Sequence, residues 1–182
     1  FPRARLNYAE NLLRRRDHVP ALVFWGEDRV KSSVTFAELH QEVSRLAQAL
    51  RNSGVKAGDR VAAYLPNIPG AVIAMLAASS IGAIWSSCSP DMGASSVLDR
   101  FRQIDPKVLI AVDGYRYGGK DFNRMSVVAD MREQLTTLEH IVLLPYLDAS
   151  SHLEGAMSWD ALLSHPDAES SVMRFEQLPA DH

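Results

Sequence analysis

From residue 59 onward, hydrophobic positions form short, mostly apolar runs that are separated by longer stretches with helical spacing. Four of these runs predict buried strands, at 60–65, 83–87, 107–112 and 141–144. Three intervening stretches predict helices, at 70–81, 95–104 and 122–135. Strands that alternate with helices about every 25 residues are typical of parallel sheets. We therefore predict an α/β fold, with helices on both faces of a parallel sheet.

Before this alternation, the pattern predicts a β-hairpin followed by an amphipathic helix. Strands are expected at 21–25 and 30–36, on either side of a polar turn. Thr35, with Glu38 three residues later, forms a capping pair that predicts a helix running to Gly54. Its buried face is expected to consist of the apolar positions at helical spacing: Leu39, Val43, Leu46, Ala47 and Leu50.

Two short helices are expected nearer the ends of the chain. Asn7 and Glu10 form a capping pair ahead of a helix over 8–15. Ser158 is the expected N-cap of a helix over 159–164.

We divide the chain into four consecutive segments. They are an N-terminal helical segment (1–20), the hairpin plus helix (21–58), the alternating strand and helix core (59–165) and an irregular connection (166–182). The chain begins at Phe1 without an initiator Met and stops in an irregular stretch. We therefore expect it to be a fragment of a longer protein.

Composition and charge narrow the classes of function. Hydrophobic residues make up 47 % and charged residues 23 %, which excludes a disordered or collagen-like chain. With 19 cations against 22 acids the net charge is −3, so we expect neither nucleic acid nor a membrane as partner. The longest apolar stretch, 71–78, is too short to span a bilayer. The single cysteine, Cys88, excludes an intrachain disulfide and favours a cytoplasmic location.

Catalytic motifs are absent from the sequence. It contains no G-x-G-x-x-G or Walker loop, no G-x-S-x-G elbow and no H-E-x-x-H pair. None of the six histidines are four residues apart, so we expect no metal site. Ser53 and Lys56 match S-x-x-K by letter, but they lie at a predicted helix end, where a chance match is the simpler interpretation. We expect no catalytic residue within this chain.

Residues 85–91 end a predicted central strand, and ligands of open parallel sheets gather just beyond such strand ends. They are either a wall of a ligand cleft or small residues that pack under a helix. In the second case Cys88 is a buried small apolar residue. As a nucleophile it has no identifiable histidine base.

Residues 113–120 are predicted to form a glycine-rich loop between a strand and a helix. Arg116 and Lys120 bring two cations near the predicted helix start, whose free N–H groups favour anions. The two tyrosines of this segment could cover an adenine or a pantetheine arm. The segment is therefore either a phosphate-binding loop or a turn with solvated charges.

Several strings cover nearly the whole chain: LNYAENLL, VTFAELH, GDRVAAYLPNIP, AMLAASSIGAIWSSCSPDMG, VLDRF and IDPKVLIAVDGYRYGGKDF. Together they resemble the acetoacetyl-CoA synthetases, which belong to the adenylate-forming acyl-CoA synthetase superfamily, close to acetyl-CoA synthetase. WSSCSPD and VDGYRYGGKDF point to the acetoacetate branch, although Met92 stands where the family pattern has Phe. The resemblance implies that the four segments are the incomplete N-terminal part of one adenylation domain.

The resemblance implies an AMP-forming acid–thiol ligase of lipid and ketone-body metabolism. Acetoacetate attacks the α-phosphate of ATP to give an acyl-adenylate and pyrophosphate, and the thiol of CoA then displaces AMP. Acetoacetate, ATP, CoA and Mg²⁺ are the implied small molecules, and the remainder of its own chain is the implied partner. The superfamily's phosphate loop, magnesium-holding acid, ribose-binding Asp and catalytic Lys are implied to follow residue 182. This chain alone is therefore expected to be inactive.

Within this chain the resemblance implies one binding site, for CoA. In acetyl-CoA synthetases, a loop with two Arg residues around a small-Gly pair holds the CoA nucleotide. By position it matches Arg116, Tyr117, Gly118, Gly119 and Lys120. Lys120 replaces the second Arg, with one extra residue between, and Lys is a point charge rather than a planar fork.

Two alternatives remain open at this stage. One is a synthetase for acetate or another short acyl group. The other is a non-catalytic nucleotide-binding or interaction module of flavodoxin-like topology.

Overall fold

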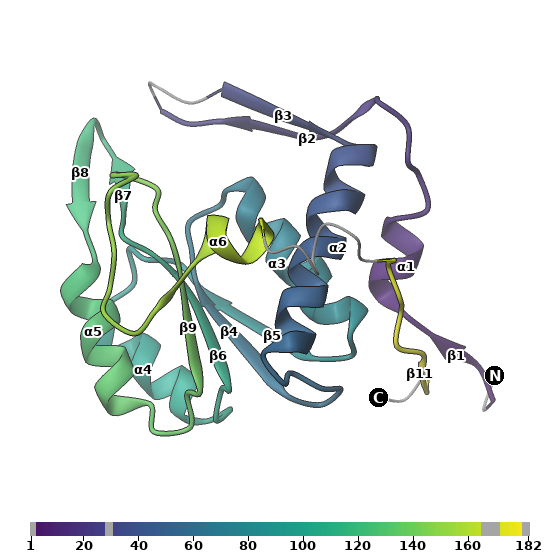
Figure 1. Cartoon of the computed structure of the whole chain (residues 1–182). Helices are drawn as coiled ribbons and strands as arrows, with labels where there is room; N and C mark the ends of the chain where they lie inside the picture. The colour runs from purple at the N-terminus through teal and green to yellow at the C-terminus, as the bar shows by residue number, and fades with distance from the viewer. Residues whose placement is uncertain (1–2, 28–30, 165–171, 180–182) are drawn as a thin grey trace.

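A computed structural model describes residues 3–27, 31–164 and 172–179 (Figure 1). At its centre lies a five-stranded sheet in which every neighbouring pair is parallel. Its strands are β4 (Arg60–Tyr64), β5 (Ile84–Cys88), β6 (Val108–Val112), β9 (His140–Leu144) and β10 (Met157–Ser158). The spatial order is β10-β9-β6-β4-β5, which is the doubly wound order 2-1-3-4-5 when the strands are counted along the chain. The predicted parallel α/β sheet is confirmed. The two-residue strand β10 is an addition to it.

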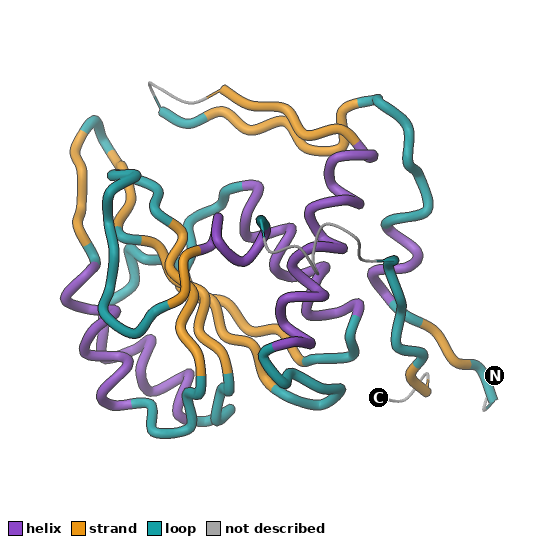
Figure 2. The backbone as a smooth tube through the Cα atoms, in the orientation of Figure 1, coloured by secondary structure: helices purple, strands orange, loops and turns teal. Residues whose placement is uncertain are grey.

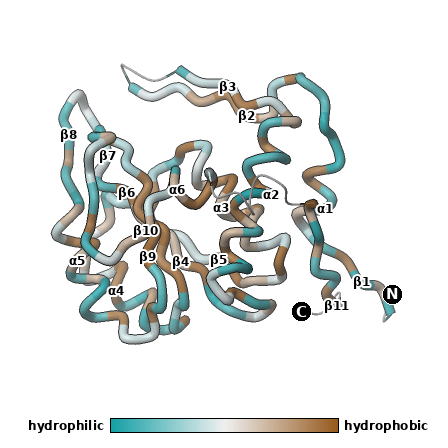
Figure 3. Tube along the Cα trace, viewed as in Figure 1, coloured by the Kyte–Doolittle hydropathy of each residue, from teal (hydrophilic) through white to brown (hydrophobic). Residues whose placement is uncertain are grey.

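Helices cover both faces of this sheet, as predicted (Figure 2). One face packs against α2 (Phe36–Asn52) and α3 (Pro69–Ser80), and the other against α4 (Ala94–Arg102) and α5 (Met125–Gln134). The alternation of side chains along β4 explains why the sheet has a core on each face. Val61 and Ala63 belong to the first core, whereas Ala62 and Tyr64 belong to the second. Figure 3 shows that the most hydrophobic residues lie along α3 and the central strands.

Helix α2 forms as its sequence predicts. Thr35 and Glu38 make the reciprocal hydrogen bonds of a capping box at its start. All five apolar positions predicted to face inward are buried: Leu39, Val43, Leu46, Ala47 and Leu50. The chain leaves the helix at Gly54, whose φ of +77° is a left-handed conformation that glycine adopts without strain.

Helix α1 (Tyr8–Leu12) is shorter than the predicted 8–15. Asn7 caps it as expected, since its side chain accepts hydrogen bonds from the backbone of Ala9 and Glu10. The Arg14 Nε donates to the carbonyl oxygen of Asn11, an acceptor that a longer helix would need for itself. The helix therefore ends one turn early.

The two ends of the described chain lie side by side. Strand β1 (Arg5–Leu6) pairs antiparallel with β11 (Leu178–Pro179). The Asn7 amide also donates to the carbonyl oxygens of Ser79, Ser80 and Glu176. Part of the segment predicted to be irregular is thus tied to the start of the chain, and the rest of it (166–171 and 180–182) lies outside the described residues.

The predicted N-terminal hairpin is present and lies over the carboxyl end of the sheet (Figure 1). It consists of β2 (Pro20–Trp25) and β3 (Lys31–Thr35), which pair antiparallel. Most of the turn that joins them lies outside the described residues. We call this element the roof hairpin.

The predicted loop at 113–120 is wrong, because these residues form most of a second hairpin. Strands β7 (Gly114–Tyr117) and β8 (Lys120–Asn123) pair antiparallel, so α5 begins later than predicted. Gly114 is required at its base, because a Cβ there would overlap the carbonyl oxygen of Phe122. We call this element the glycine hairpin.

Helix α6 (Trp159–Leu163) is present close to its predicted position. Ser158 occupies its N-cap, but its side chain makes no capping hydrogen bond, which corrects the predicted mechanism.

Within the described residues, β5 pairs only with β4, so one edge of the sheet has no partner strand. Ile84, at the start of β5, is 47 % exposed. None of the described helices is long and apolar enough to cross a membrane.

Candidate functional site

The candidate site lies at the carboxyl edge of the sheet. In this strand order the chain leaves β4 toward one face of the sheet and leaves β6 toward the other, and open α/β sheets bind ligands at that switch point. The roof hairpin, the glycine hairpin and the loop after β9 meet above this edge (Figure 1).

Asp113 organises this edge from the end of β6. It is 1 % exposed, and its carboxylate accepts hydrogen bonds from the backbone N–H groups of residues 146–148, at 2.7–3.2 Å. The Ser151 hydroxyl donates to it as well, at 3.0 Å. Because four separate groups donate to one buried carboxylate, Asp113 fixes the loop after β9 against the base of the glycine hairpin.

The aromatic side chains of the glycine hairpin have different environments. Tyr115 stacks on Phe122 with ring centroids 5.1 Å apart, and the Arg124 guanidinium lies 5.1 Å from the Tyr115 ring. Arg124 also donates to the Tyr115 hydroxyl and to the Pro90 carbonyl oxygen. Tyr115 is therefore built into the hairpin, whereas Tyr117 is 70 % exposed and available to a planar ligand.

The two predicted cations lie on opposite strands of the glycine hairpin. Arg116 makes a bidentate ion pair with Asp121, with N–O distances of 2.6 and 2.9 Å, and its side chain is 15 % exposed. Lys120 is exposed next to the turn. Neither lies at the start of α5, as the sequence had indicated, because β8 separates them from that helix.

Gly118 and Gly119 form the tip of this hairpin, and they bind a carboxylate. Both have positive φ, +59° and +73°, as a two-residue type I′ turn requires. The N–H of Gly118 donates to Oε1 of Glu27 and the N–H of Gly119 to Oε2, each at 3.0 Å. Glu27 follows β2, so this contact joins the tips of the two hairpins.

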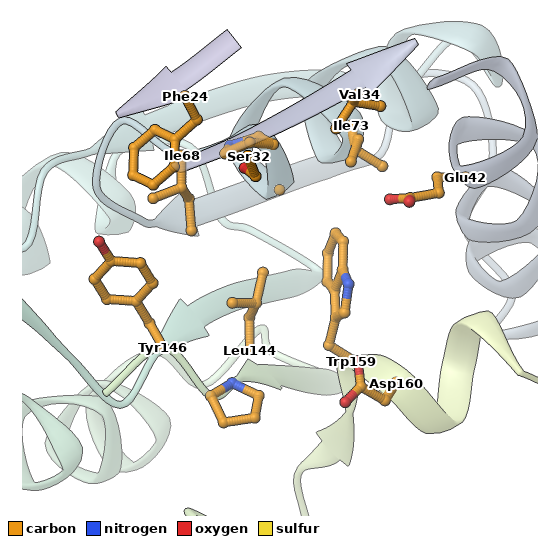
Figure 4. Close-up of a pocket in the computed structure, with 13 residues that line it drawn as sticks. Phe24, Ser32, Val34, Glu42, Ile68, Ile73, Leu144, Tyr146, Trp159 and Asp160 are labelled. Atoms are coloured by element: carbon orange, nitrogen blue, oxygen red, sulfur yellow. The ribbon is translucent and has the colours of Figure 1, made fainter. Parts of the chain in front are cut away.

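A pocket of about 340 Å³ lies beneath the roof hairpin (Figure 4). Its walls come from the roof hairpin, α2, the start of α3, the end of β9 and the start of α6, and include Phe24, Ile68, Ile73, Leu144, Tyr146 and Trp159. Glu42 points into it, and burial raises the pKa of this carboxyl. An apolar lining with Glu42 and Asp160 as its charged groups suits an uncharged apolar group and repels phosphate.

The segment after β5 packs as a structural element. Cys88 is 5 % exposed, and burial raises the pKa of its thiol, so the nucleophilic thiolate is disfavoured. The Pro90 carbonyl oxygen accepts hydrogen bonds from the Tyr64 hydroxyl and from Arg124. These contacts favour the packing interpretation of residues 85–91 over the cleft-wall one.

In the part of the chain that the structure describes, no three His, Cys, Asp or Glu side chains gather in a metal-binding group. The described residues therefore do not fit a Mg²⁺ site.

Sequence reasoning missed Glu27, Glu42 and the anchoring role of Asp113. Gly-Gly between Tyr-Arg-Tyr and Lys-Asp-Phe carries a hairpin signal that could have located the type I′ turn. No local sequence pattern indicates the contact of Glu27, because its partners are 91 and 92 residues away in the chain.

The fold and the arrangement of its carboxyl edge define a doubly wound α/β protein, with a candidate ligand site at the carboxyl ends of its strands. The chain belongs to the AMP-binding enzyme family, whose family model matches residues 9–178. It is 48 % identical over its whole length to an acetoacetyl-coenzyme A synthetase of Rhizobium meliloti (strain 1021) and 44 % identical to the acetoacetyl-CoA synthetase of Mus musculus.

Among solved structures, the acetoacetyl-CoA synthetase from Streptomyces lividans superposes with a TM-score of 0.91 at 46 % identity, covering 98 % of this chain. The resemblance found in the sequence is thus confirmed. The chain spans 28 % of the length of the curated relatives and 27 % of the solved one.

Proposed function

We propose that the protein containing this chain is an AMP-forming acetoacetate–CoA ligase. The observation that supports the proposal most strongly is that the whole of this chain aligns, at 48 % identity, with a protein of that name. In the first half-reaction an acetoacetate carboxylate oxygen bonds to the α-phosphorus of ATP, and the bond to pyrophosphate breaks. In the second the CoA thiolate bonds to the acyl carbon, and AMP leaves with the electron pair of the acyl–oxygen bond. Mg²⁺ is proposed as the ion of the first step, held by residues beyond the part of the chain that the structure describes, and the cytoplasm as the location.

The described residues contribute positioning to this chemistry rather than proton transfer. Cys88 is buried as a thiol, and both carboxylate oxygens of Asp113 accept hydrogen bonds from the loop after β9. The chain therefore supplies a rigid edge on which a ligand is held, and positioning is itself a large source of rate enhancement.

The activity is tested on the full-length protein by acid-dependent ATP–pyrophosphate exchange and by mass spectrometry of the CoA thioester. We expect exchange with acetoacetate to exceed that with acetate and propionate. The 182-residue chain by itself is expected to give no exchange above a blank. A preference for acetate would replace this assignment with the short-chain alternative. Exchange by the isolated chain would mean that it carries an adenylation site of its own.

As the CoA-binding part of the site we propose the glycine hairpin, through Arg116, Tyr117, Gly118, Gly119 and Lys120. Its tip already holds a carboxylate on two backbone N–H groups, which is the kind of contact a phosphate oxygen makes. Lys120 adds positive charge next to the tip, and Arg116 lies one position further away, where Asp121 pairs with it until a phosphate takes its place. The exposed Tyr117 ring offers a stacking surface.

Arg116→Ala is expected to raise the KM for CoA on the order of 10-fold, because a charge-assisted contact is lost. Lys120→Ala is expected to act in the same direction and more weakly, since an exposed ammonium is screened. The KM values for ATP and acetoacetate should be unchanged, since CoA enters after the adenylate has formed.

Asp121→Asn is the matched control for Arg116→Ala, because it breaks the same ion pair and keeps the arginine. It should not raise the KM for CoA. Equal losses for CoA and ATP in Arg116→Ala would indicate a folding defect, and an unchanged KM for CoA in all three variants would leave the hairpin as a structural turn.

A further inference from the structure

The glycine hairpin presents an anion site that the chain fills with its own carboxylate. In a type I′ turn the N–H groups of the two central residues point outward, away from the strand ladder. Here both of them converge on one carboxylate, one N–H to each oxygen, at 3.0 Å. Two oxygens of a phosphate present a similar spacing and the same sign of charge. A phosphate and the Glu27 carboxylate therefore cannot occupy these two donors together.

The surroundings of the tip favour an anion over a neutral ligand. Lys120 adjoins the turn directly, and Tyr117 pairs with it across the hairpin. One step further from the tip, Arg116 pairs with Asp121 in the strand register. Within the described residues, the carboxylate that reaches the tip amides comes from Glu27, whereas Asp121 is held by Arg116.

Glu27 also links the tip to the pocket. It follows β2, and the strands of the same roof hairpin supply Phe24, Ser32 and Val34 to the pocket lining. Releasing Glu27 from the glycines removes two hydrogen bonds that hold the roof hairpin to the glycine hairpin. Occupation of the tip by a phosphate would thus remove these two hydrogen bonds from the element that covers the pocket.

We propose that Glu27 is an internal competitor for the phosphate of CoA at the Gly118–Gly119 turn, and so sets the affinity of this site. The proposal rests on the CoA assignment made above. It concerns a residue on a different hairpin, outside the matching loop. The Glu27 contact holds the two hairpins together when the tip is free of ligand, and the incoming phosphate exchanges with it.

The test uses the full-length protein and three variants: Glu27→Gln, Glu27→Asp and, as a control, Glu133→Gln. Glu133 is an exposed acid on α5, so its substitution removes the same charge away from the tip. The measurements are the KM for CoA and the inhibition constant of adenosine 3′,5′-bisphosphate, a phosphate-bearing fragment of CoA, against CoA.

Glu27→Gln is expected to lower both constants by roughly 2- to 5-fold, since it weakens an exposed charge-assisted contact. Glu27→Asp keeps the charge but shortens the reach, and should lower them less. Glu133→Gln should leave both unchanged, and the KM for ATP should be the same in every variant.

A KM for CoA that is unchanged or raised in Glu27→Gln would overturn the competitor role. If Arg116→Ala still raised that KM, the CoA site would stand and only the role of Glu27 would fail. If neither variant changed it, the CoA assignment itself would fail. An equal decrease in Glu133→Gln would reduce the effect to net charge and would also overturn the proposal.

Discussion

At the scale of single residues, Glu42 is a carboxyl group placed against an apolar pocket. Burial raises its pKa above the usual 4.5, so the folded protein holds this proton more tightly than the unfolded chain does. The stability that this proton confers is complete below pH 4.5 and is lost as the pH rises through the folded-state pKa. At neutral pH the ionised form therefore destabilises the fold.

Glu42→Gln is expected to raise the Tm of the full-length protein at pH 7, with a difference that shrinks as the pH falls toward 4. Thermal unfolding across this pH range measures it, and Glu133→Gln, which removes an exposed carboxyl group, is the control for the loss of one acid. A lower Tm for Glu42→Gln at pH 7 would mean that the carboxylate has a stabilising partner.

At the scale of elements, α2 and α6 both have a hydroxyl residue at the N-cap, but only one of the two side chains makes a capping hydrogen bond. Thr35 takes part in a reciprocal capping box, whereas the Ser158 side chain makes no capping hydrogen bond. Thr35→Ala is expected to lower the free energy of unfolding by about 1 kcal/mol. Ser158→Ala should lower it much less. Denaturant unfolding of both variants checks the difference, and equal losses would contradict the assignment of the cap.

Elements whose pattern is local were predictable, and those defined by distant partners were not. The inward face of α2 and the buried strand β6 follow from spacing within one element. The pairing of β1 with β11 and the loop held by Asp113 depend on residues far along the chain. The glycine hairpin lies between these cases. The Gly-Gly pair between two short strands is a local hairpin pattern, but the three glycines of the segment also favour a loop.

The same division applies to the candidate site. Residues 116–120 could be picked out because glycines and cations cluster in one short segment. The group that this cluster binds within the chain could not be predicted, because the Glu27 contact joins two hairpins that no sequence pattern links. Nor does the sequence predict the ion pair of Arg116 with Asp121, because its pattern predicts a loop where the structure has two paired strands.

At the scale of the whole molecule, apolar groups gather beside β5, the edge of the sheet that has no second partner strand within the described residues. Leu6, Tyr8 and Ile84 are 53 %, 57 % and 47 % exposed and line a second pocket with Leu178. The isolated chain is expected to bind a hydrophobic dye strongly or to aggregate, because an open strand edge next to an apolar patch invites association. The full-length protein should bind less dye per molecule. A soluble monomer with one sharp thermal transition would contradict this expectation.

The hydrogen bond between Asn7 and Glu176 also determines when some of the N-terminal contacts can form during synthesis. The two residues are 169 positions apart, so the Asn7 amide must wait for nearly the whole segment to leave the ribosome. At roughly 5–20 residues per second, that wait is on the order of ten to thirty seconds. During this interval the first helix can already pack against α3, since Ala9 and Leu13 belong to the same core, but the strand that fastens it does not yet exist. Part of the native contacts at the beginning of the chain thus forms only after nearly all of the described residues have been synthesised.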